Sequence, residues 1–413
     1  MSRRLLALGV GLLLAPELSR AASFEVEALP PAPGQPRILL ARRPGRLATI
    51  RILFGAGAVE DGERRGLTRL TQHALLAANR RLDHEALLLD VHAAAADLRV
   101  ETGVKDSAFV LTADRRDFPR LAKQLAAAVL SPRLDSTRYS RAAALAMIDG
   151  RQPGGGATLL SLVASLTMDD GRYLNEPFGE RGALESLTFD DVAEHLDRFM
   201  SPAQATVIVT GRFDRDDMLR FLRGFRGGRA TVPSRPNVTL PIRIRKRAEN
   251  ETYLLGYSLQ LSTPRDAAAA RLAAALIDTE LWKRFRDAGV GYTFTVTPVR
   301  TPWLDMLLVL LPAHDPSALD LSSHVLDVIE RVRTGRFDDA RLDHCRKAAL
   351  AELEEEDRDP GALARALSRH GETWHGPKVV DALRAMGRAE FIGAISPALE
   401  RERSLFAYFG PSP

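Results

Sequence analysis

The sequence predicts an α+β protein with two homologous domains. Each half opens with an apolar, strand-like segment, at residues 48–54 and 252–257, and continues into helical segments. Strands and helices that are grouped in this way are typical of the α+β class. Two sequence echoes, which occur in the same order in both halves, indicate a duplicated domain of about 200 residues.

The echoes relate particular segments of the two halves. Residues 134–139 precede a long Ala-rich helix, and residues 337–342 repeat this arrangement 203 positions later. A helix that ends at Ser-Pro is followed by an apolar strand that stops at glycine in residues 201–211, and the same pattern recurs in residues 396–410.

The N-terminus has the features of a secretory signal. Arg3 and Arg4 precede an apolar run at residues 5–14, and the small residues around Ala21 suit a signal peptidase. An uncleaved anchor is the alternative, but the run is shorter than the ~20 residues of a membrane span and Pro16 interrupts it. Because no later stretch is long and apolar enough to span, we expect a periplasmic or secreted protein, cleaved near Ala21, with no membrane span.

A linker separates the predicted domains. Residues 226–245 are rich in glycine, proline and basic residues and lack helical periodicity. The sequence therefore predicts a signal peptide at residues 1–21, an N-terminal domain at residues 22–225, this linker, and a C-terminal domain at residues 246–413.

Chain length, net charge and cysteine content limit the possible functions further. With 413 residues and 45% hydrophobic content, the chain can form two cores. The formal net charge of +4 is too small to indicate a nucleic-acid partner. Cys345 is the only cysteine, which excludes an intrachain disulfide, and its place in a helical pattern favours a packed thiol over a nucleophile.

The first half carries an altered zinc motif. After the first strand come a glycine, an acidic turn and Gly66-Leu67, and then a helix that reads Arg-Leu-Thr-Gln-His at residues 69–73. This segment resembles the opening of the insulinase or pitrilysin family of metallopeptidases, whose inverted zinc motif is H-x-x-E-H. The resemblance implies mainly antiparallel sheets packed with helices, forming half of a clam-shaped peptidase.

The substitutions remove the chemistry of that motif. Two histidines at positions i and i+4 share a helix face and can hold zinc, while the glutamate takes a proton from the bound water. Arg69 keeps its proton and cannot bind a metal, and the neutral amide of Gln72 cannot act as a base. Only His73 remains, which we expect on the helix surface or in a groove.

The resemblance places the third zinc ligand on a later helix, near Asp149, 76 residues after His73. One histidine and one aspartate are too few for a catalytic zinc, which ordinarily has three protein ligands. We therefore expect no catalytic residue, no metal and no cofactor on this chain.

The second half resembles the family at residues 281–296, a helix, a turn and a strand. In relatives an arginine and a tyrosine six residues later face the zinc domain and hold the substrate backbone, and Arg286 and Tyr292 match these positions. Both side chains offer hydrogen-bond donors that suit a peptide carbonyl or an oxyanion. The alternative is an ordinary arginine at a helix end and a tyrosine that caps the core.

The resemblance also implies a partner, because this family divides labour between chains, as mitochondrial processing peptidase does with a zinc-bearing and a zinc-less subunit. We expect the non-catalytic, substrate-gripping subunit of an exported heterodimer. A homologous partner would supply the zinc and bind the peptide as an added strand. The alternative is a structural or peptide-binding scaffold with no protease partner, and no residue favours an active enzyme with another site.

Overall fold

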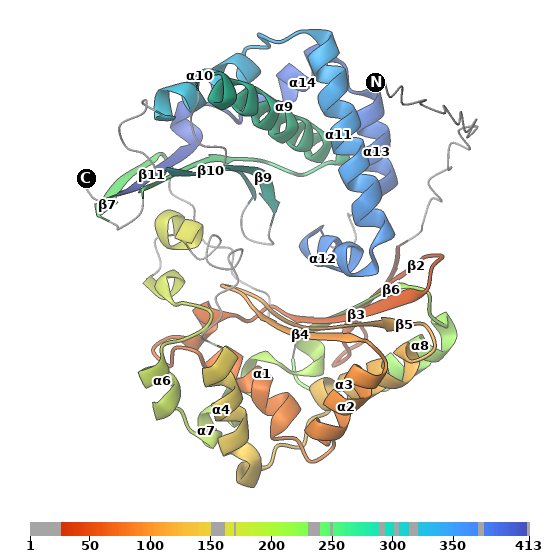
Figure 1. Ribbon diagram of the computed structural model, residues 1–413. Helices are drawn as coiled ribbons and strands as arrows, with labels where there is room; N and C mark the ends of the chain where they lie inside the picture. Colours follow the sequence, from red (N-terminus) through yellow and green to blue (C-terminus); the bar gives the residue numbers. More distant parts are fainter. Residues whose placement is uncertain are drawn as a thin grey trace, which may run out of the picture.

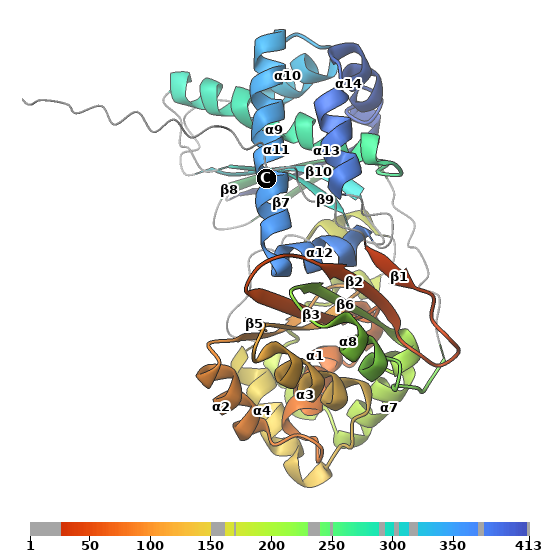
Figure 2. The same ribbon diagram turned by 90° about the vertical axis from the view of Figure 1, so that its right-hand side faces the viewer.

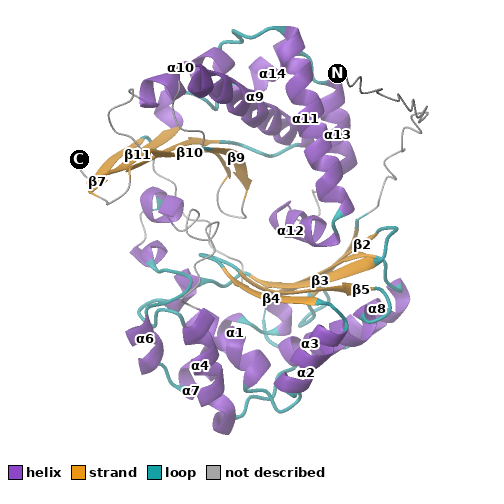
Figure 3. Ribbon diagram, in the orientation of Figure 1, coloured by secondary structure: helices purple, strands orange, loops and turns teal. Residues whose placement is uncertain are grey.

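Two β-sheets lie in the middle of the molecule, and helices cover the outer face of each (Figure 1). The computed structural model describes residues 26–149, 162–168, 171–229, 240–247, 251–288, 294–300, 305–313, 321–370 and 376–410. Figure 3 shows the resulting four layers, helices, sheet, sheet and helices.

The first sheet has six strands in the order β1-β2-β6-β3-β5-β4. Strands β2 and β6 are parallel, and the other neighbours are antiparallel. Strand β3 lies in the centre and is almost fully buried, as its apolar sequence predicts. The strands are β1 (Glu27–Leu29), β2 (Arg37–Arg42), β3 (Leu47–Phe54), β4 (Asp97–Thr102), β5 (Ser107–Asp114) and β6 (Ala205–Gly211).

The second sheet has five strands in the order β7-β11-β8-β10-β9. Strands β7 and β11 are parallel, and the other neighbours are antiparallel. The strands are β7 (Ile242–Arg247), β8 (Glu251–Ser258), β9 (Thr295–Arg300), β10 (Asp305–Ala313) and β11 (Ser404–Gly410).

The two sheets have the same topology, which confirms the predicted fold class of two homologous domains. Without β1, the order β2-β6-β3-β5-β4 corresponds strand by strand to β7-β11-β8-β10-β9, and each sheet has one parallel pair at the same place. Strands β6 and β11 are the apolar strands of the second sequence echo, and both end at a glycine.

Helices of the first half cover the outer face of the first sheet. Helix α1 is buried along its whole length beneath the sheet and packs against α4 and α7. The helices are α1 (Leu67–Ala77), α2 (His84–Ala93), α3 (Phe118–Leu130), α4 (Tyr139–Asp149), α6 (Arg181–Ser186), α7 (Phe189–Phe199) and α8 (Arg215–Leu222), with short 3-10 turns at Ala58–Asp61, Ser136–Arg138, Gly171–Leu174 and Pro202–Gln204.

Helices of the second half are arranged in the same way around α9, which packs against α10, α11, α13 and α14. The side chain of Cys345 is buried in α11, and burial raises the pKa of its thiol, in agreement with a packed residue. The helices are α9 (Pro264–Ala288), α10 (Leu321–Arg333), α11 (Asp339–Arg358), α12 (Pro360–His370), α13 (Gly376–Ala385) and α14 (Arg388–Ile395), with a 3-10 turn at Arg401–Arg403.

The two halves exchange helices at their interface. Helix α12 of the second half lies on the inner face of the first sheet (Figure 2), where it contacts β3 and β6. Thr210 donates a hydrogen bond to the Pro360 carbonyl at 2.7 Å. Conversely, residues 162–168 of the first half pack into one apolar cluster with residues of β8, β10 and β11. Each sheet is therefore covered on its inner face by a segment of the other half.

The domain boundaries stay a prediction. No strand is shared between the two sheets in the part of the chain that the structure describes. Part of the predicted linker, residues 230–239, and the predicted signal peptide, residues 1–21, lie outside the described residues. None of the helices within the described ranges is both long enough and apolar enough to cross a membrane.

Candidate functional site

A buried carboxylate caps the N-terminus of helix α1, which carries the altered zinc motif. The Asp61 carboxylate accepts hydrogen bonds from the backbone N–H groups of Gly66 and Thr68, at 2.8 and 2.7 Å. These are donors that a helix start otherwise leaves unsatisfied, and the helix dipole favours a negative group there. Gly66 has a φ of +89°, and a Cβ there would lie 2.7 Å from a Leu184 methyl group, so the glycine is required.

A buried hydrogen-bonded chain continues from this cap into α7. The Thr68 hydroxyl lies 2.6 Å from Asp61 Oδ1 and 3.0 Å from His195 Nε2. All three side chains are buried. Burial raises the pKa of Asp61 to about 7 and lowers the pKa of His195 to about 4, so both groups favour their neutral forms.

The position that the resemblance assigns to a catalytic glutamate holds a structural amide. Gln72 is fully buried, and its Nε2 donates to the backbone carbonyls of Glu101 and Ala108 at 3.1 and 3.2 Å. Its Oε1 accepts a hydrogen bond of 2.7 Å from the Thr102 hydroxyl. The side chain therefore ties α1 to the β4–β5 hairpin with both ends of its amide.

The two positions of the metal-binding histidines differ. The Arg69 guanidinium lies over the Phe178 ring, with 4.8 Å from its central carbon to the ring centroid. This cation–π contact needs the charge that excludes a metal. His73 is only 7% exposed, so it does not lie on an open helix surface.

The residues of this helix therefore do not fit a zinc ion. Arg69 cannot ligate, and the amide of Gln72 is engaged by two carbonyls and a hydroxyl. Within the described ranges no group of three or more His, Cys, Asp or Glu residues is placed to hold a metal.

Asp149 lies at the C-terminal end of α4, the helix that packs alongside α1. The backbone N–H of Asp135, before α4, donates to the carbonyl of Ala78, just after α1, so the two helices run antiparallel. The end of α4 thus points toward the start of α1. The side chain of Asp149 lies outside the described residues, and its approach to His73 stays a prediction.

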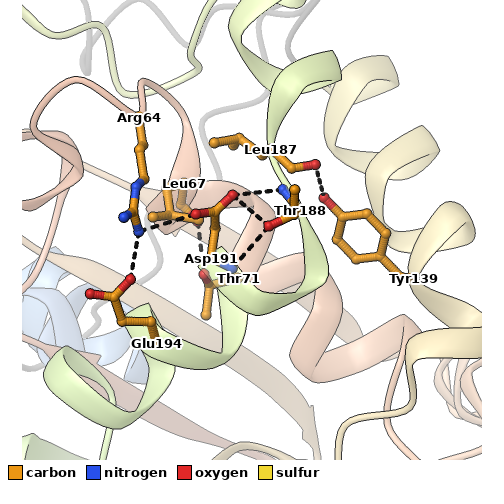
Figure 4. Close-up of polar contacts among 8 residues, drawn as sticks. All are labelled: Arg64, Leu67, Thr71, Tyr139, Leu187, Thr188, Asp191 and Glu194. Atoms are coloured by element: carbon orange, nitrogen blue, oxygen red, sulfur yellow. Dashed lines mark hydrogen bonds and ion pairs between the residues drawn. The ribbon is translucent and has the colours of Figure 1, made fainter.

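Polar contacts fix α7 against the start of α1 (Figure 4). Arg64 pairs with Glu194 at 2.7 Å and with Asp191 at 3.2 Å. Asp191 also closes a capping box with Thr188 at the start of α7. The Tyr139 hydroxyl donates to the Leu187 carbonyl at 2.6 Å, which adds α4 to the same assembly.

A polar cavity of about 420 Å³ opens beside this cap. Lys105 and Glu60 form an ion pair of 2.7 Å on its wall, and both side chains are nearly buried. The buried Asp61 and His195 also line it. The cavity is lined by Gly55, Val59, Glu60, Asp61, Gly62, Arg64, Leu67, Lys105, Arg172, Glu194, His195, Arg198 and Phe199.

Arg286, one of the two predicted substrate-gripping residues, lies in the second half. Arg286 is in the last turn of α9, its side chain is 66% exposed, and it lies 3.6 Å from the Asp287 carboxylate. Tyr292 lies outside the described residues, so the pairing of these two side chains stays a prediction. Near Arg286, the rings of Trp282 and Phe285 both pack edge-on against Phe294.

Sequence reasoning missed the partners of the altered motif. His195 is 127 positions from Thr68, and no spacing rule connects them. Phe178 follows a segment without periodicity. The only available signal was the acidic turn before Gly66, because a carboxylate near a helix start can accept from its free N–H groups and is favoured by the helix dipole.

One family model matches part of the chain. Residues 186–349 match the family model described as the peptidase M16 inactive domain. This match runs from the end of α6 into α11 and so includes parts of both halves. No curated protein sequence matches the chain.

Solved structures share the fold along nearly the whole chain. A peptidase M16 inactive domain from Pseudomonas fluorescens is 14% identical, with a TM-score of 0.74, over 94% of this chain and 98% of that one. A protease from Helicobacter pylori is 12% identical, with a TM-score of 0.76, over 94% and 100%. A chain of Complex III2 from Candida albicans, with Inz-5 bound, is 14% identical, with a TM-score of 0.73, over 94% and 96%.

Proposed function

Since this chain is of the M16 (insulinase) peptidase family, with a domain of the inactive type, we propose that it is a non-catalytic subunit that grips the substrate of an exported, zinc-dependent M16 peptidase. The zinc and the general base belong to a homologous partner chain. This chain supplies one half of the clam-shaped peptidase and the contacts that hold a peptide backbone.

The observation that carries this proposal is the use of Gln72. A general base must hold a lone pair toward a water, whereas the amide of Gln72 is bonded at both ends to the β4–β5 hairpin. Arg69 adds a permanent positive charge where a metal would bind. The helix that does chemistry in an active relative serves here to hold the sheet.

The likeness to assembled relatives supports the subunit role. One similar chain comes from Complex III2 and another from a protease. The fold shared with these chains extends over 94% of this chain, which supports assembly with a homologous chain. We place the contact with the peptide at Arg286 and Tyr292, and we place the complex outside the cytoplasm, after cleavage near Ala21.

The test is reconstitution with an exported homologue that has an intact H-x-x-E-H motif. We expect neither this chain nor its zinc-free partner to cleave an unstructured peptide, and the zinc-loaded pair to cleave it. In the pair, Tyr292→Phe should lower kcat by about 10² to 10³, as loss of an oxyanion donor does. Arg286→Ala should be at least as damaging and should raise KM, because it removes a positioning contact.

Two matched variants separate catalysis from folding. Lys283→Ala removes an exposed charge on the same helix and should leave kcat unchanged. Tyr139→Phe loses the hydroxyl that bonds Leu187, so it should lower the melting temperature without changing kcat. Normal turnover in a stable Tyr292→Phe pair would exclude the gripping role, and a chain that binds peptides but no peptidase would be a scaffold.

A further inference from the structure

A groove on the second half has no counterpart on the first, because there a helix fills the same place. The groove encloses about 550 Å³ between strands β7 and β11 and helix α10. Its floor holds the buried Leu255 and Tyr257, and its walls include the half-buried Leu326 and Phe406. It is lined by Arg243, Ile244, Arg245, Leu255, Tyr257, Leu326, Arg401, Ser404, Leu405 and Phe406.

The duplication shows what covers this place in the first half. Strands β2 and β6 correspond to β7 and β11, and helix α3 corresponds to α10. Helix α8 contacts both β2 and α3, and its Met218, Leu219 and Leu222 belong to the core beneath the sheet. Among the described residues of the second half, no helix occupies the position of α8.

Equivalent residues of the two halves show that the groove corresponds to the surface on which α8 packs in the first half. Lys123 and Leu326 are each the sixth residue of their helix, and Lys123 forms an ion pair of 2.7 Å with Asp217 of α8. The residue at this position therefore contacts α8 in the first half. In the second half it is a leucine that faces the groove.

The strand positions beneath α8 have changed character. In both parallel pairs the last strand residue opposes a glycine, Arg42 opposite Gly211 and Arg247 opposite Gly410. Counting back from these pairs, Ile38 and Leu40, which lie in the core with α8, correspond to Arg243 and Arg245. Both arginines are exposed at the groove.

The rim of the groove is therefore basic. Among the described residues that line it, Arg243, Arg245 and Arg401 are basic and none is acidic, while Glu330, Glu400 and Glu402 line an adjoining cavity that shares Tyr257, Leu326 and Arg401. The Arg243 guanidinium is held in place by the backbone carbonyls of Ser404 and Arg401, at 2.9 and 3.1 Å, and no described carboxylate forms an ion pair with it. A ligand for this site needs carboxylates toward β7 and apolar side chains toward α10.

From this geometry we infer that the groove binds an acidic amphipathic helix of a partner protein, seated as α8 is seated in the first half. Apolar residues of the helix at spacings of three and four, as in Leu219, Met218 and Leu222, enter between Leu326 and Phe406. Acidic residues on the adjacent face pair with Arg243 and Arg245. The proposal holds whether or not the partner is a peptidase.

The test uses the full chain and a synthetic helix. The probe is a fluorescein-labelled peptide of residues 213–225 in which Arg215→Glu, Arg220→Glu and Arg223→Glu make the polar face acidic. We expect saturable binding that weakens as salt is added, with helicity induced on binding. A second peptide with Met218→Ser, Leu219→Ser and Leu222→Ser should bind at least tenfold more weakly.

Variants of the chain locate the binding. Leu326→Glu and Arg245→Glu should each raise the Kd of the probe at least tenfold. The matched controls are Leu89→Glu, at an apolar side chain that is 70% exposed on α2, and Arg81→Glu, at an exposed arginine, and neither should change the Kd. Melting curves verify that each variant is folded. If Leu326→Glu fails to fold, Arg245→Glu, at an exposed site, still tests where the probe binds.

Three results of the binding assay would overturn the inference. They are no binding of the acidic probe, equal binding of both peptides, and equal binding to the wild-type chain and the Arg245→Glu variant. Self-association of the chain that Leu326→Glu abolishes would also overturn it, because the occupant would then be a second copy. The assay contains no peptidase, so its failure would leave the subunit role untouched.

Discussion

The amide of Gln72 donates to two backbone carbonyls and accepts from one hydroxyl, a set of partners that a carboxylate cannot satisfy. A glutamate at this position would direct lone pairs at the carbonyls of Glu101 and Ala108. The residue at the motif's glutamate position is thus part of the core, and replacing it with glutamate has a structural cost.

We predict that Gln72→Glu lowers the free energy of unfolding by about 2 to 4 kcal/mol, because a buried charged group loses its donors and faces two acceptors. Urea denaturation monitored by circular dichroism measures this. The control is Gln260→Glu at an exposed site, which should change stability by less than ~0.5 kcal/mol. Zinc-dependent peptidase activity of the isolated Arg69→His/Gln72→Glu chain would contradict the structural role of the amide.

Asp61 and His195, which Thr68 connects, should make opposite contributions to the pH dependence of stability. The folded-state pKa of Asp61 is raised to about 7, so its contribution to stability is full at low pH and is lost as the pH rises toward 7. The folded-state pKa of His195 is lowered to about 4, so its contribution is full above pH 6.5 and is lost as the pH falls toward 4. Across pH 4 to 6.5 the two slopes oppose each other.

The wild-type chain should therefore show little net slope from this pair. His195→Gln should leave a stability that falls by about 3 kcal/mol from pH 4 to 7, and Asp61→Asn one that rises by a similar amount. Urea denaturation at half-unit pH steps measures both. Parallel pH profiles for the two variants would contradict this opposition.

At the scale of the element, helix α1 depends on a glycine at its start. Gly66→Ala should destabilise the chain by about 1 to 3 kcal/mol, because φ is +89° and the new Cβ would meet Leu184. Gly182→Ala is the control, since no atom lies within 4 Å of a Cβ in α6, and it should be neutral or stabilising by up to ~1 kcal/mol. Thermal melts of both variants provide the comparison, and equal melting temperatures would show that the turn tolerates a side chain.

The sequence predicted elements where the signal is local. The Ala-rich helices after residues 134–139 and 337–342 and the two glycine-ended strands occur as α4, α11, β6 and β11. The order of strands came only with the structure, because hydrophobic periodicity identifies a strand but not its neighbours. In the same way the motif at residues 69–73 indicated a lost metal site, but His195 could not be found, since a contact over 127 positions leaves no pattern in one sequence.

The whole molecule is held together by the exchanged segments. Leu367 of α12 is fully buried in a cluster that includes Leu39 and Ile208 of the first sheet, while Val163 and Ala164 lie in a cluster with strands of the second. Neither sheet keeps its inner face covered if the halves separate. The apolar area exposed by separation makes unfolding of one half alone unfavourable.

We therefore predict a single cooperative unfolding transition. Leu367→Ala should lower the free energy of unfolding by about 2 to 5 kcal/mol and move the whole transition without splitting it. Differential scanning calorimetry measures this, with Ile148→Ala, at a side chain that is 61% exposed, as the control. Two resolved transitions, or a calorimetric enthalpy far above the van't Hoff value, would show that the halves unfold independently.

The exchange of α12 and residues 162–168 also affects how the two halves of the gene can evolve. Each sheet is completed by a segment encoded in the other half of the gene, so a substitution under α12 selects for compensation some 150 codons away, as between Thr210 and Pro360. A crossover near the linker would mismatch two interfaces at once. Placing the two halves on separate genes would therefore leave the inner face of each sheet without its covering segment, although each half supplies all described strands of its own sheet.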